Sequence, residues 1–141
     1  MKILFKKINS DAKIPQFAQP GDAGMDLFSV EDLSLKPGER AGIKTGIALE
    51  IPLGYVGLIW DKSGVASKSG IKTAGGVIDS GYRGEIVVLL VNLSKDDYNI
   101  KKGQKVAQLL IQKVENPEIL EADALTETAR GEGGFGSTGI E

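Results

Sequence analysis

Short apolar runs separated by turn residues recur along the whole chain, and no long helical pattern interrupts them. The runs at residues 55–60, 86–91 and 106–114 are dense enough to predict strands that are buried on both faces. Ile47, Leu49 and Ile51 alternate with small or polar residues, which predicts a half-buried strand. Many short strands with frequent turns are typical of an all-β domain.

The remaining segments extend this pattern. Residues 2–8 and 25–30 predict two further strands, joined by a connection at residues 9–22 that contains Pro15 and Pro20. Pro37-Gly38 marks a turn, and Trp60 is expected in the core. Only residues 63–69 favour a short helix, with Ser63 as its N-cap.

The chain is divided at its C-terminal end by a shift in composition. Its 141 residues are the usual length of one domain, and no internal repeat is present. Beyond Ala129 the sequence becomes rich in glycine. We therefore expect a β domain at residues 1–129 and a flexible glycine-rich arm at residues 130–141.

Composition and charge exclude several classes of protein. The chain is 41% hydrophobic and 26% charged, as ordinary globular domains are. No apolar run approaches the roughly 20 residues that cross a bilayer, and the N-terminus lacks a secretory apolar stretch, so no membrane partner is expected. A net charge of −2 disfavours nucleic-acid binding, and the absence of cysteine favours an intracellular, cytoplasmic setting.

The chain contains neither histidine nor cysteine. It therefore has no conventional zinc ligand set, no Ser-His triad and no thiolate nucleophile. A general base in this chain must be a carboxylate, a tyrosine or a lysine. A bound metal is expected to be a hard cation such as Mg²⁺ on oxygen ligands.

Two segments point to chemistry on a nucleotide. Residues 75–85 (Gly-Gly-Val-Ile-Asp-Ser-Gly-Tyr-Arg-Gly-Glu) predict a tight hairpin that directs one carboxylate and nearby amides into a concave site. Residues 130–139 (Arg-Gly-Glu-Gly-Gly-Phe-Gly-Ser-Thr-Gly) combine a cation, an aromatic ring and two hydroxyls with many glycines. A mobile arm that binds phosphate and stacks on a base fits this composition.

Five short blocks carry a resemblance to a known family. They are Ala-Gly-Met-Asp-Leu at 23–27, Asp-Lys-Ser-Gly-Val-Ala at 61–66, the segment at 76–85, Gly-Gln-Lys-Val-Ala-Gln-Leu at 103–109, and the tail at 130–139. In order and spacing they resemble the five motifs of the homotrimeric dUTPases. The resemblance implies a jelly roll, or distorted β-barrel (β-clip), that assembles as a homotrimer with each active site drawn from three chains.

The same resemblance implies an activity. The chain is expected to hydrolyse dUTP to dUMP and pyrophosphate with Mg²⁺, by attack of water on the α-phosphorus. Such an enzyme keeps uracil out of DNA and supplies dUMP for dTMP synthesis. No zinc, nucleic acid or membrane partner is implied.

The resemblance assigns roles around the predicted hairpin. Asp79 would orient and deprotonate the attacking water, although an Asp at such a turn also commonly caps its own backbone. The ring of Tyr82 would lie against the deoxyribose and exclude a ribose 2′-hydroxyl. Gly76, Val77 and Ile78 would offer backbone groups to the uracil edge. Thr73 stands where many relatives have Asn for a pyrimidine contact.

Other motifs supply the phosphate and metal groups. Lys62, Ser63 and Gly64 would seat phosphates at the start of the short helix. The family usually has Arg where this chain has Lys62, and Lys lacks the planar fork of Arg. Gln108 would contact the α-phosphate and the water, or else face solvent. Asp26 would hold Mg²⁺ through waters, or else be a surface carboxylate.

The tail would close the site. Arg130 would pair with the γ-phosphate, Phe135 would stack over the uracil, and Ser137 and Thr138 would add hydrogen bonds. Gly136 lies between them and is included among the substrate-binding residues.

Two alternatives to dUTP hydrolysis stay open from the sequence. One is a dCTP deaminase of the same superfold, which also uses no zinc; release of ammonia from dCTP distinguishes it. The other is a non-catalytic nucleotide-binding module, for which the replacements at Lys62 and Thr73 leave room.

Overall fold

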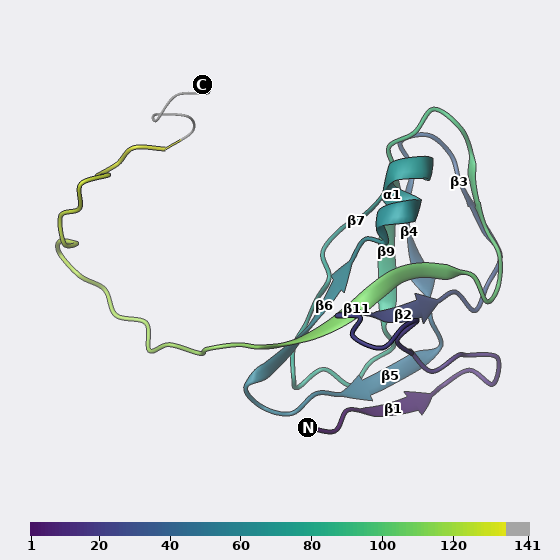
Figure 1. Cartoon of the computed structure of the whole chain (residues 1–141), viewed down its shortest axis with the longest axis horizontal. Helices are drawn as coiled ribbons and strands as arrows, with labels where there is room; N and C mark the ends of the chain where they lie inside the picture. The colour runs from purple at the N-terminus through teal and green to yellow at the C-terminus, as the bar shows by residue number, and fades with distance from the viewer. Residues whose placement is uncertain (135–141) are drawn as a thin grey trace.

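The computed structural model describes residues 1–134, which contain eleven strands and one short helix (Figure 1). The elements are β1 (Leu4–Lys7), β2 (Met25–Phe28), β3 (Leu33–Leu35), β4 (Arg40–Lys44), β5 (Ile47–Glu50), β6 (Tyr55–Trp60), α1 (Ser63–Ser69), β7 (Ile71–Thr73), β8 (Val77–Ile78), β9 (Val87–Asn92), β10 (Tyr98–Ile100) and β11 (Lys105–Lys113). The prediction of an all-β domain is confirmed.

The strands form four antiparallel sheets. The largest has the order β2-β11-β6-β8, and the second has the order β4-β9-β7. Two strand pairs, β1-β5 and β3-β10, complete the set. None of these sheets closes on itself within residues 1–134, so the distorted barrel of the sequence-based expectation is not a closed barrel.

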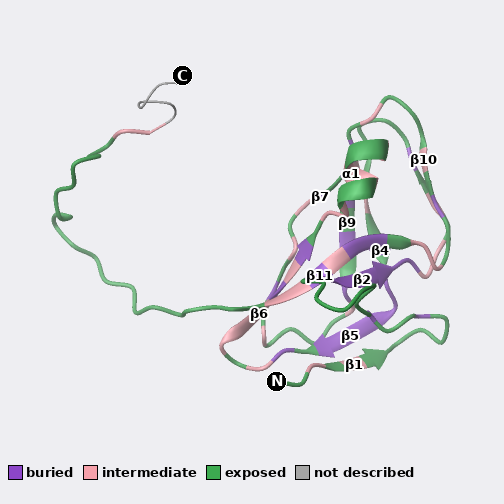
Figure 2. Ribbon diagram, in the orientation of Figure 1, coloured by how far each residue is buried: buried purple, intermediate pink, exposed green. Residues whose placement is uncertain are grey.

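The core lies between these sheets and consists mainly of Ile, Leu and Val (Figure 2). Its fully buried members include Leu27, Ile43, Val88, Leu90 and Leu109. Branched side chains of this kind pack well on pleated strands and account for most of the apolar area removed from water. The apolar runs of the sequence therefore become strands because each supplies at least one face of this core.

Three strands are less buried than the sequence predicts. In β11 only Val106, Ala107 and Leu109 are buried. In β9 every second residue is buried while Val87 and Leu89 are 44% and 36% exposed. In β6 only Gly57 and Ile59 are buried. The prediction of burial on both faces is therefore wrong for these strands in the isolated chain, because the core covers one face of each and leaves much of the other accessible. Trp60, expected in the core, is 54% exposed at the end of β6.

The segment at residues 75–85 is not a hairpin. β8 pairs with β6, with Gly57 opposite Ile78, whereas β9 pairs with β4 and β7. The loop between Asp79 and Ile86 therefore crosses from the first sheet to the second. A local turn does hold it, since the Tyr82 amide donates to the Asp79 carbonyl at 3.0 Å.

The helix α1 occupies the predicted residues, but its cap differs. Lys62, in extended backbone at φ −84° and ψ 121°, is the N-cap and makes no side-chain capping bond. Ser63 is therefore the first helical residue and not the cap. Gly70 ends the helix in the left-handed region, at φ +62°, which favours glycine.

The chain leaves the sheets after β11. Val114 still donates its amide to the Gly54 carbonyl, and residues 115–132 are all exposed. Figure 1 shows this segment running away from the domain. The division of the chain at residue 129 stays a prediction; the last strand already ends at Lys113. Within residues 1–134, no helix is long and apolar enough to span a bilayer.

Candidate active site

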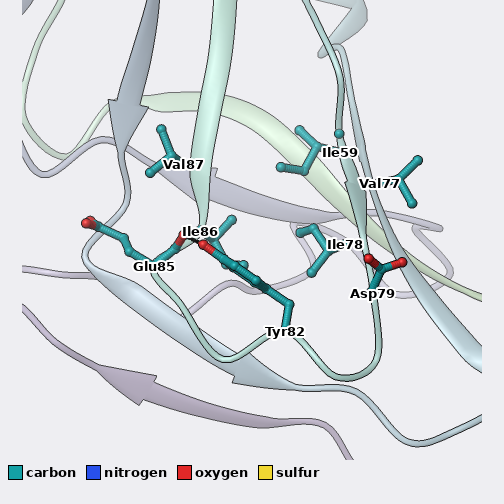
Figure 3. A pocket seen from close by; sticks show the side chains of 9 residues that line it. Ile59, Val77, Ile78, Asp79, Tyr82, Glu85, Ile86 and Val87 are labelled. Carbon is teal, nitrogen blue, oxygen red and sulfur yellow. Dashed lines mark hydrogen bonds between the residues drawn. The ribbon is translucent and has the colours of Figure 1, made fainter.

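A pocket of about 220 Å³ opens where the loop after β8 crosses between the sheets. Apolar side chains from both sheets line it, and the loop adds polar groups (Figure 3). The lining residues are Ile59, Gly76, Val77, Ile78, Asp79, Tyr82, Glu85, Ile86 and Val87. All the residues predicted around the hairpin except Thr73 thus lie together, even though the hairpin itself is absent.

Asp79 and Tyr82 bring polar groups to this pocket. Asp79 directly follows Ile78 at the end of β8, and its side chain is exposed. The Tyr82 hydroxyl donates to the Glu85 carbonyl at 2.9 Å, so the ring reaches across the loop. Figure 3 shows the ring extending toward Ile86, with Asp79 on the opposite side of the loop. One free carboxylate therefore borders an apolar pocket.

The backbone at Gly76 cannot carry a side chain. Its φ is +107°, and a Cβ there would lie 2.8 Å from the Ile59 carbonyl oxygen. The Gly76 carbonyl in turn accepts from the Ile59 amide at 2.8 Å. Glycine is needed because β6 and the start of β8 approach so closely at this point. The approach fixes one wall of the pocket.

A second group gathers on the face of the largest sheet, around Asp26. In the strand register Gln108 of β11 lies opposite Asp26 of β2 and opposite Trp60 of β6. Asp26 is only 2% exposed, so the alternative of a surface carboxylate is wrong. Its Oδ1 accepts from Lys62 Nζ, and Lys105 Nζ lies 2.6 Å from its Oδ2. Asp26, Lys62 and Gln108 are therefore neighbours.

Lys105 is a member of this group that the sequence did not reveal. Lys105 lies opposite Phe28, and the register shifts between Lys105 and Ala107, which marks a β-bulge. One extra residue reverses the alternation of faces, so Lys105 and Gln108, three positions apart, share the face of Asp26. Without the bulge, simple alternation would place them on opposite faces.

The two lysines govern the charge of Asp26. Burial acts to raise its pKa, but the close contacts and positive charges of Lys105 and Lys62 outweigh burial and hold the pKa below its ordinary value of 3.8. Asp26 is therefore a buried carboxylate that stays ionised beside two cations.

Gln108 and Thr73 are both tied to Asp61. Gln108 is half-buried, and its Nε2 donates to the Asp61 carbonyl at 2.8 Å, so the alternative of a solvent-facing amide is wrong. Thr73, 9% exposed, donates its hydroxyl to Asp61 Oδ1 at 2.8 Å. It does not line the pocket of Asp79 but borders a neighbouring hollow with Trp60 and Gly76. Its pyrimidine contact stays a prediction.

Ser63 and Gly64 form the exposed start of α1. A Cβ placed on Gly64 would meet no atom within 4 Å beyond its chain neighbours and the backbone of its own helix. Packing within the described chain therefore does not require glycine here, and the surface beside Lys62 is open to a ligand.

Arg130 lies apart from both groups. It is exposed on the segment beyond β11, where its Nε donates to the Gly133 carbonyl at 2.8 Å. Phe135, Gly136, Ser137 and Thr138 fall outside the described residues, so their predicted contacts stay predictions.

The described residues offer little to a metal directly. Within residues 1–134, no three acidic side chains come together in a way that would hold an ion. Asp26 Oδ2 is nevertheless buried without a hydrogen bond of ordinary geometry, despite the nearby Lys105. This one acceptor fits a water carried by an ion whose other ligands come from elsewhere, which is how Mg²⁺ is usually held.

Comparisons with known proteins show which family the chain resembles. The dUTPase family model matches residues 10–139. A deoxyuridine 5'-triphosphate nucleotidohydrolase from Clostridium kluyveri is 49% identical, over 99% of this chain and 99% of its own length. Another, from Nautilia profundicola, is 50% identical over the same shares of both chains.

Solved structures show the same fold. The dUTPase of Staphylococcus bacteriophage 80alpha with dUpNHpp has a TM-score of 0.93 and 33% identity, and the match covers 99% of both chains. A mutant dUTPase from phage phi11 of S. aureus, which coordinates a structural Mg(II) ion, has a TM-score of 0.84 and 31% identity over 90% of this chain and all of its own. The jelly-roll-like fold is thereby confirmed, and the chain belongs to the dUTPase family.

Proposed function

We propose that this protein hydrolyses dUTP to dUMP and pyrophosphate. The observation that carries the proposal is the exposed carboxylate of Asp79 at the rim of an apolar pocket, in a chain that has no histidine or cysteine to act in its place. The relatives named above favour hydrolysis of dUTP over deamination of dCTP.

In this proposal the pocket holds the deoxyuridine. The backbone of Gly76, Val77 and Ile78 pairs with the uracil edge, where cytosine presents the wrong pattern of donors and acceptors. The ring of Tyr82 lies against the deoxyribose and leaves no room for a 2′-hydroxyl. Asp79 orients a water and removes its proton as the water attacks the α-phosphorus. Apolar walls strengthen each of these polar contacts by excluding bulk water.

In this proposal the phosphates bind beside the group of side chains around Asp26. Lys62 Nζ supplies a positive charge, and Ser63 and Gly64 supply a hydroxyl and an unobstructed backbone. Gln108 donates its amide toward the α-phosphate oxygen on which negative charge increases during the attack. Arg130 pairs with the γ-phosphate, and Phe135, Gly136, Ser137 and Thr138 cover the uracil and sugar.

Mg²⁺ is proposed as the cofactor, held by the triphosphate and contacted through water by Asp26. The buried Oδ2 of Asp26 supports this role. When bound, the ion neutralises negative charge on the phosphates. Lys62 and Lys105 keep Asp26 ionised, so that it can accept a hydrogen bond from a metal-bound water.

We further propose that the enzyme is a homotrimer whose active sites combine residues of three chains. The pocket of one chain, about 220 Å³, lies below the roughly 300–1,000 Å³ of typical ligand sites. The segment beyond β11 runs away from its own domain (Figure 1). Both features support a site whose remaining walls come from neighbouring chains. In this trimer the pocket and the phosphate-binding residues of one chain belong to two different active sites.

Such an enzyme keeps uracil out of DNA and provides dUMP for dTMP synthesis. We place it in the cytoplasm, because nucleoside triphosphates are made and used inside cells.

A substrate panel tests the proposal. The purified protein is incubated with Mg²⁺ and dUTP, dCTP, dTTP or UTP, and pyrophosphate and ammonia are measured separately. We expect pyrophosphate from dUTP alone and ammonia from none. Ammonia from dCTP would identify a deaminase, and binding of dUTP without any product would identify a non-catalytic module.

A further inference from the structure

Asp61, in the connection between β6 and α1, accepts four hydrogen bonds. Its Oδ1 accepts from the Thr73 amide at 2.6 Å and from the Thr73 hydroxyl at 2.8 Å. Its Oδ2 accepts from Lys72 Nζ at 2.6 Å. The carboxylate therefore ties the end of β6 to β7, a strand of the other sheet.

The main chain of Asp61 has a different hydrogen-bond partner from its side chain. Its carbonyl accepts from Gln108 Nε2 at 2.8 Å, and the next residue, Lys62, donates to Asp26. A substitution that freed the Asp61 side chain would therefore release two neighbours at once. One is the amide of Gln108, and the other is the ammonium of Lys62.

We propose that Asp61 is a positioning residue for the side chains that bind the phosphates. Its carboxylate anchors the connection from β6 to α1, and so holds Gln108 and Lys62 in place for the triphosphate. This inference rests on the proposed function. The fixed segment matters because hydrogen-bond donors stabilise a reacting phosphate only when they are already oriented before the reaction.

Lys72 makes a carboxylate tolerable at this position. Asp61 directly precedes the proposed phosphate ligand Lys62, so an uncompensated negative charge there would repel a triphosphate. The ammonium of Lys72, 2.6 Å from Oδ2, offsets that charge. Lys72 lies on β7 beside Thr73, so one strand supplies both the anchor and the neutralising charge.

The experiment measures kcat and KM for dUTP with Asp61→Ala, Asp61→Asn, Gln108→Ala and the double variant Asp61→Ala/Gln108→Ala. We expect Asp61→Ala to lower kcat about tenfold to a hundredfold, since small displacements of catalytic groups cost this much. Asp61→Asn keeps an Oδ1 acceptor for Thr73, so its kcat stays within about fivefold of wild type, because partly exposed ion pairs contribute little.

The double variant separates positioning from structure. If Asp61 acts through Gln108, Asp61→Ala lowers kcat much less in the Gln108→Ala background than in wild type, because the amide is already gone. Asp32→Ala is a matched control, because Asp32 also accepts a main-chain amide, that of Lys102, and lies near a lysine; its kcat should equal that of wild type.

A second measurement does not depend on turnover. The single tryptophan of the chain, Trp60, adjoins Asp61, so acrylamide quenching of its fluorescence reports on this segment. We expect stronger quenching in Asp61→Ala and unchanged quenching in Asp61→Asn.

Each outcome has a distinct meaning. Full additivity of Asp61→Ala and Gln108→Ala in kcat, with an active wild type, would overturn the positioning of Gln108 by Asp61 and leave the proposed function standing. Unchanged kcat and quenching in Asp61→Ala would do the same. A wild type that hydrolyses no dUTP would overturn both.

Discussion

Asp26 is a buried carboxylate that two lysines keep ionised. Its pKa in the folded chain lies below the ordinary 3.8, so the unfolded chain takes up the proton first as the pH falls. The stability that Asp26 contributes is complete above about pH 4 and is lost as the pH falls through the folded pKa. Acid therefore weakens the sheet at the place where β2, β6 and β11 meet.

Replacement of Asp26 tests the predicted loss of stability in acid. We expect Asp26→Asn to lower the free energy of unfolding by about 2 kcal/mol at neutral pH, because Lys62 and Lys105 lose a charged partner. Urea unfolding at several pH values should show the difference from wild type shrinking below about pH 4. A difference that stays constant there would contradict the account. Asp11→Asn, at an exposed ion pair with Lys102, is the control and should change little.

Tyr82 is expected to govern the choice between deoxyribose and ribose. Tyr82→Ala opens the pocket beside the sugar, so we expect kcat/KM for UTP relative to dUTP to rise about tenfold or more, the usual effect of relieving a small steric conflict. Tyr82→Phe keeps the ring and loses only the bond to the Glu85 carbonyl, so it should retain the discrimination. If Tyr82→Ala rejected UTP as strongly as wild type, the ring would not be the barrier.

Among the elements, the segment beyond β11 is the one whose removal should separate stability from activity. Residues 115–132 are exposed and contribute nothing to the core. Removal of residues 130–141 should therefore leave the melting temperature nearly unchanged while it lowers kcat about a hundredfold or more, since a closing segment excludes water and positions phosphate.

Thermal melting and dUTP turnover of the shortened chain check this prediction. Equal turnover in the shortened and full chains would show that the segment has no part in the reaction. A large fall in melting temperature would show that it is needed for the fold.

The elements also show what the sequence could and could not predict. The strands with apolar runs, such as β6, β9 and β11, were predictable because such runs reflect burial of at least one face. α1 buries no residue, so its prediction rested on a serine at the helix start and not on burial. β3, β4, β7 and β10 were not, because these short strands mix polar and apolar residues and are held by partners distant in sequence. The same reason explains why the segment at residues 75–85 read as a hairpin although β8 pairs with β6.

The site divides in the same way. Asp79, Tyr82 and Gly76 were predictable from their motif, and the pocket brings them together. Lys105 and Asp61 were not, because their positions depend on a β-bulge and on hydrogen bonds between elements far apart in sequence. Local patterns identified the residues proposed to bind, whereas the residues proposed to hold them in place emerge only from the tertiary contacts.

At the scale of the whole molecule, the exposed face of β9 is expected to be an interface between copies of the chain. Val87 and Leu89 expose apolar surface there, beside the proposed site. Leu89→Glu would bury a charge in such an interface, so we expect it to convert a trimer into monomers and to abolish turnover.

Sedimentation velocity checks this prediction. Wild type should have three times the mass of one chain, and Leu89→Glu the mass of one. Leu53→Glu is the matched control, because Leu53 is 89% exposed in the turn between β5 and β6, and it should stay trimeric and active. A monomeric wild type that hydrolyses dUTP would contradict the shared site.

The proposed hydrolysis depends most directly on the carboxylate of Asp79. The deciding measurement is the initial rate of pyrophosphate release from dUTP by wild type and by Asp79→Asn, a change at an exposed side chain that should leave the fold intact. We predict rapid release by wild type and a rate at least about a hundredfold lower in the variant, the usual contribution of a general base. Equal rates would show that another group activates the water.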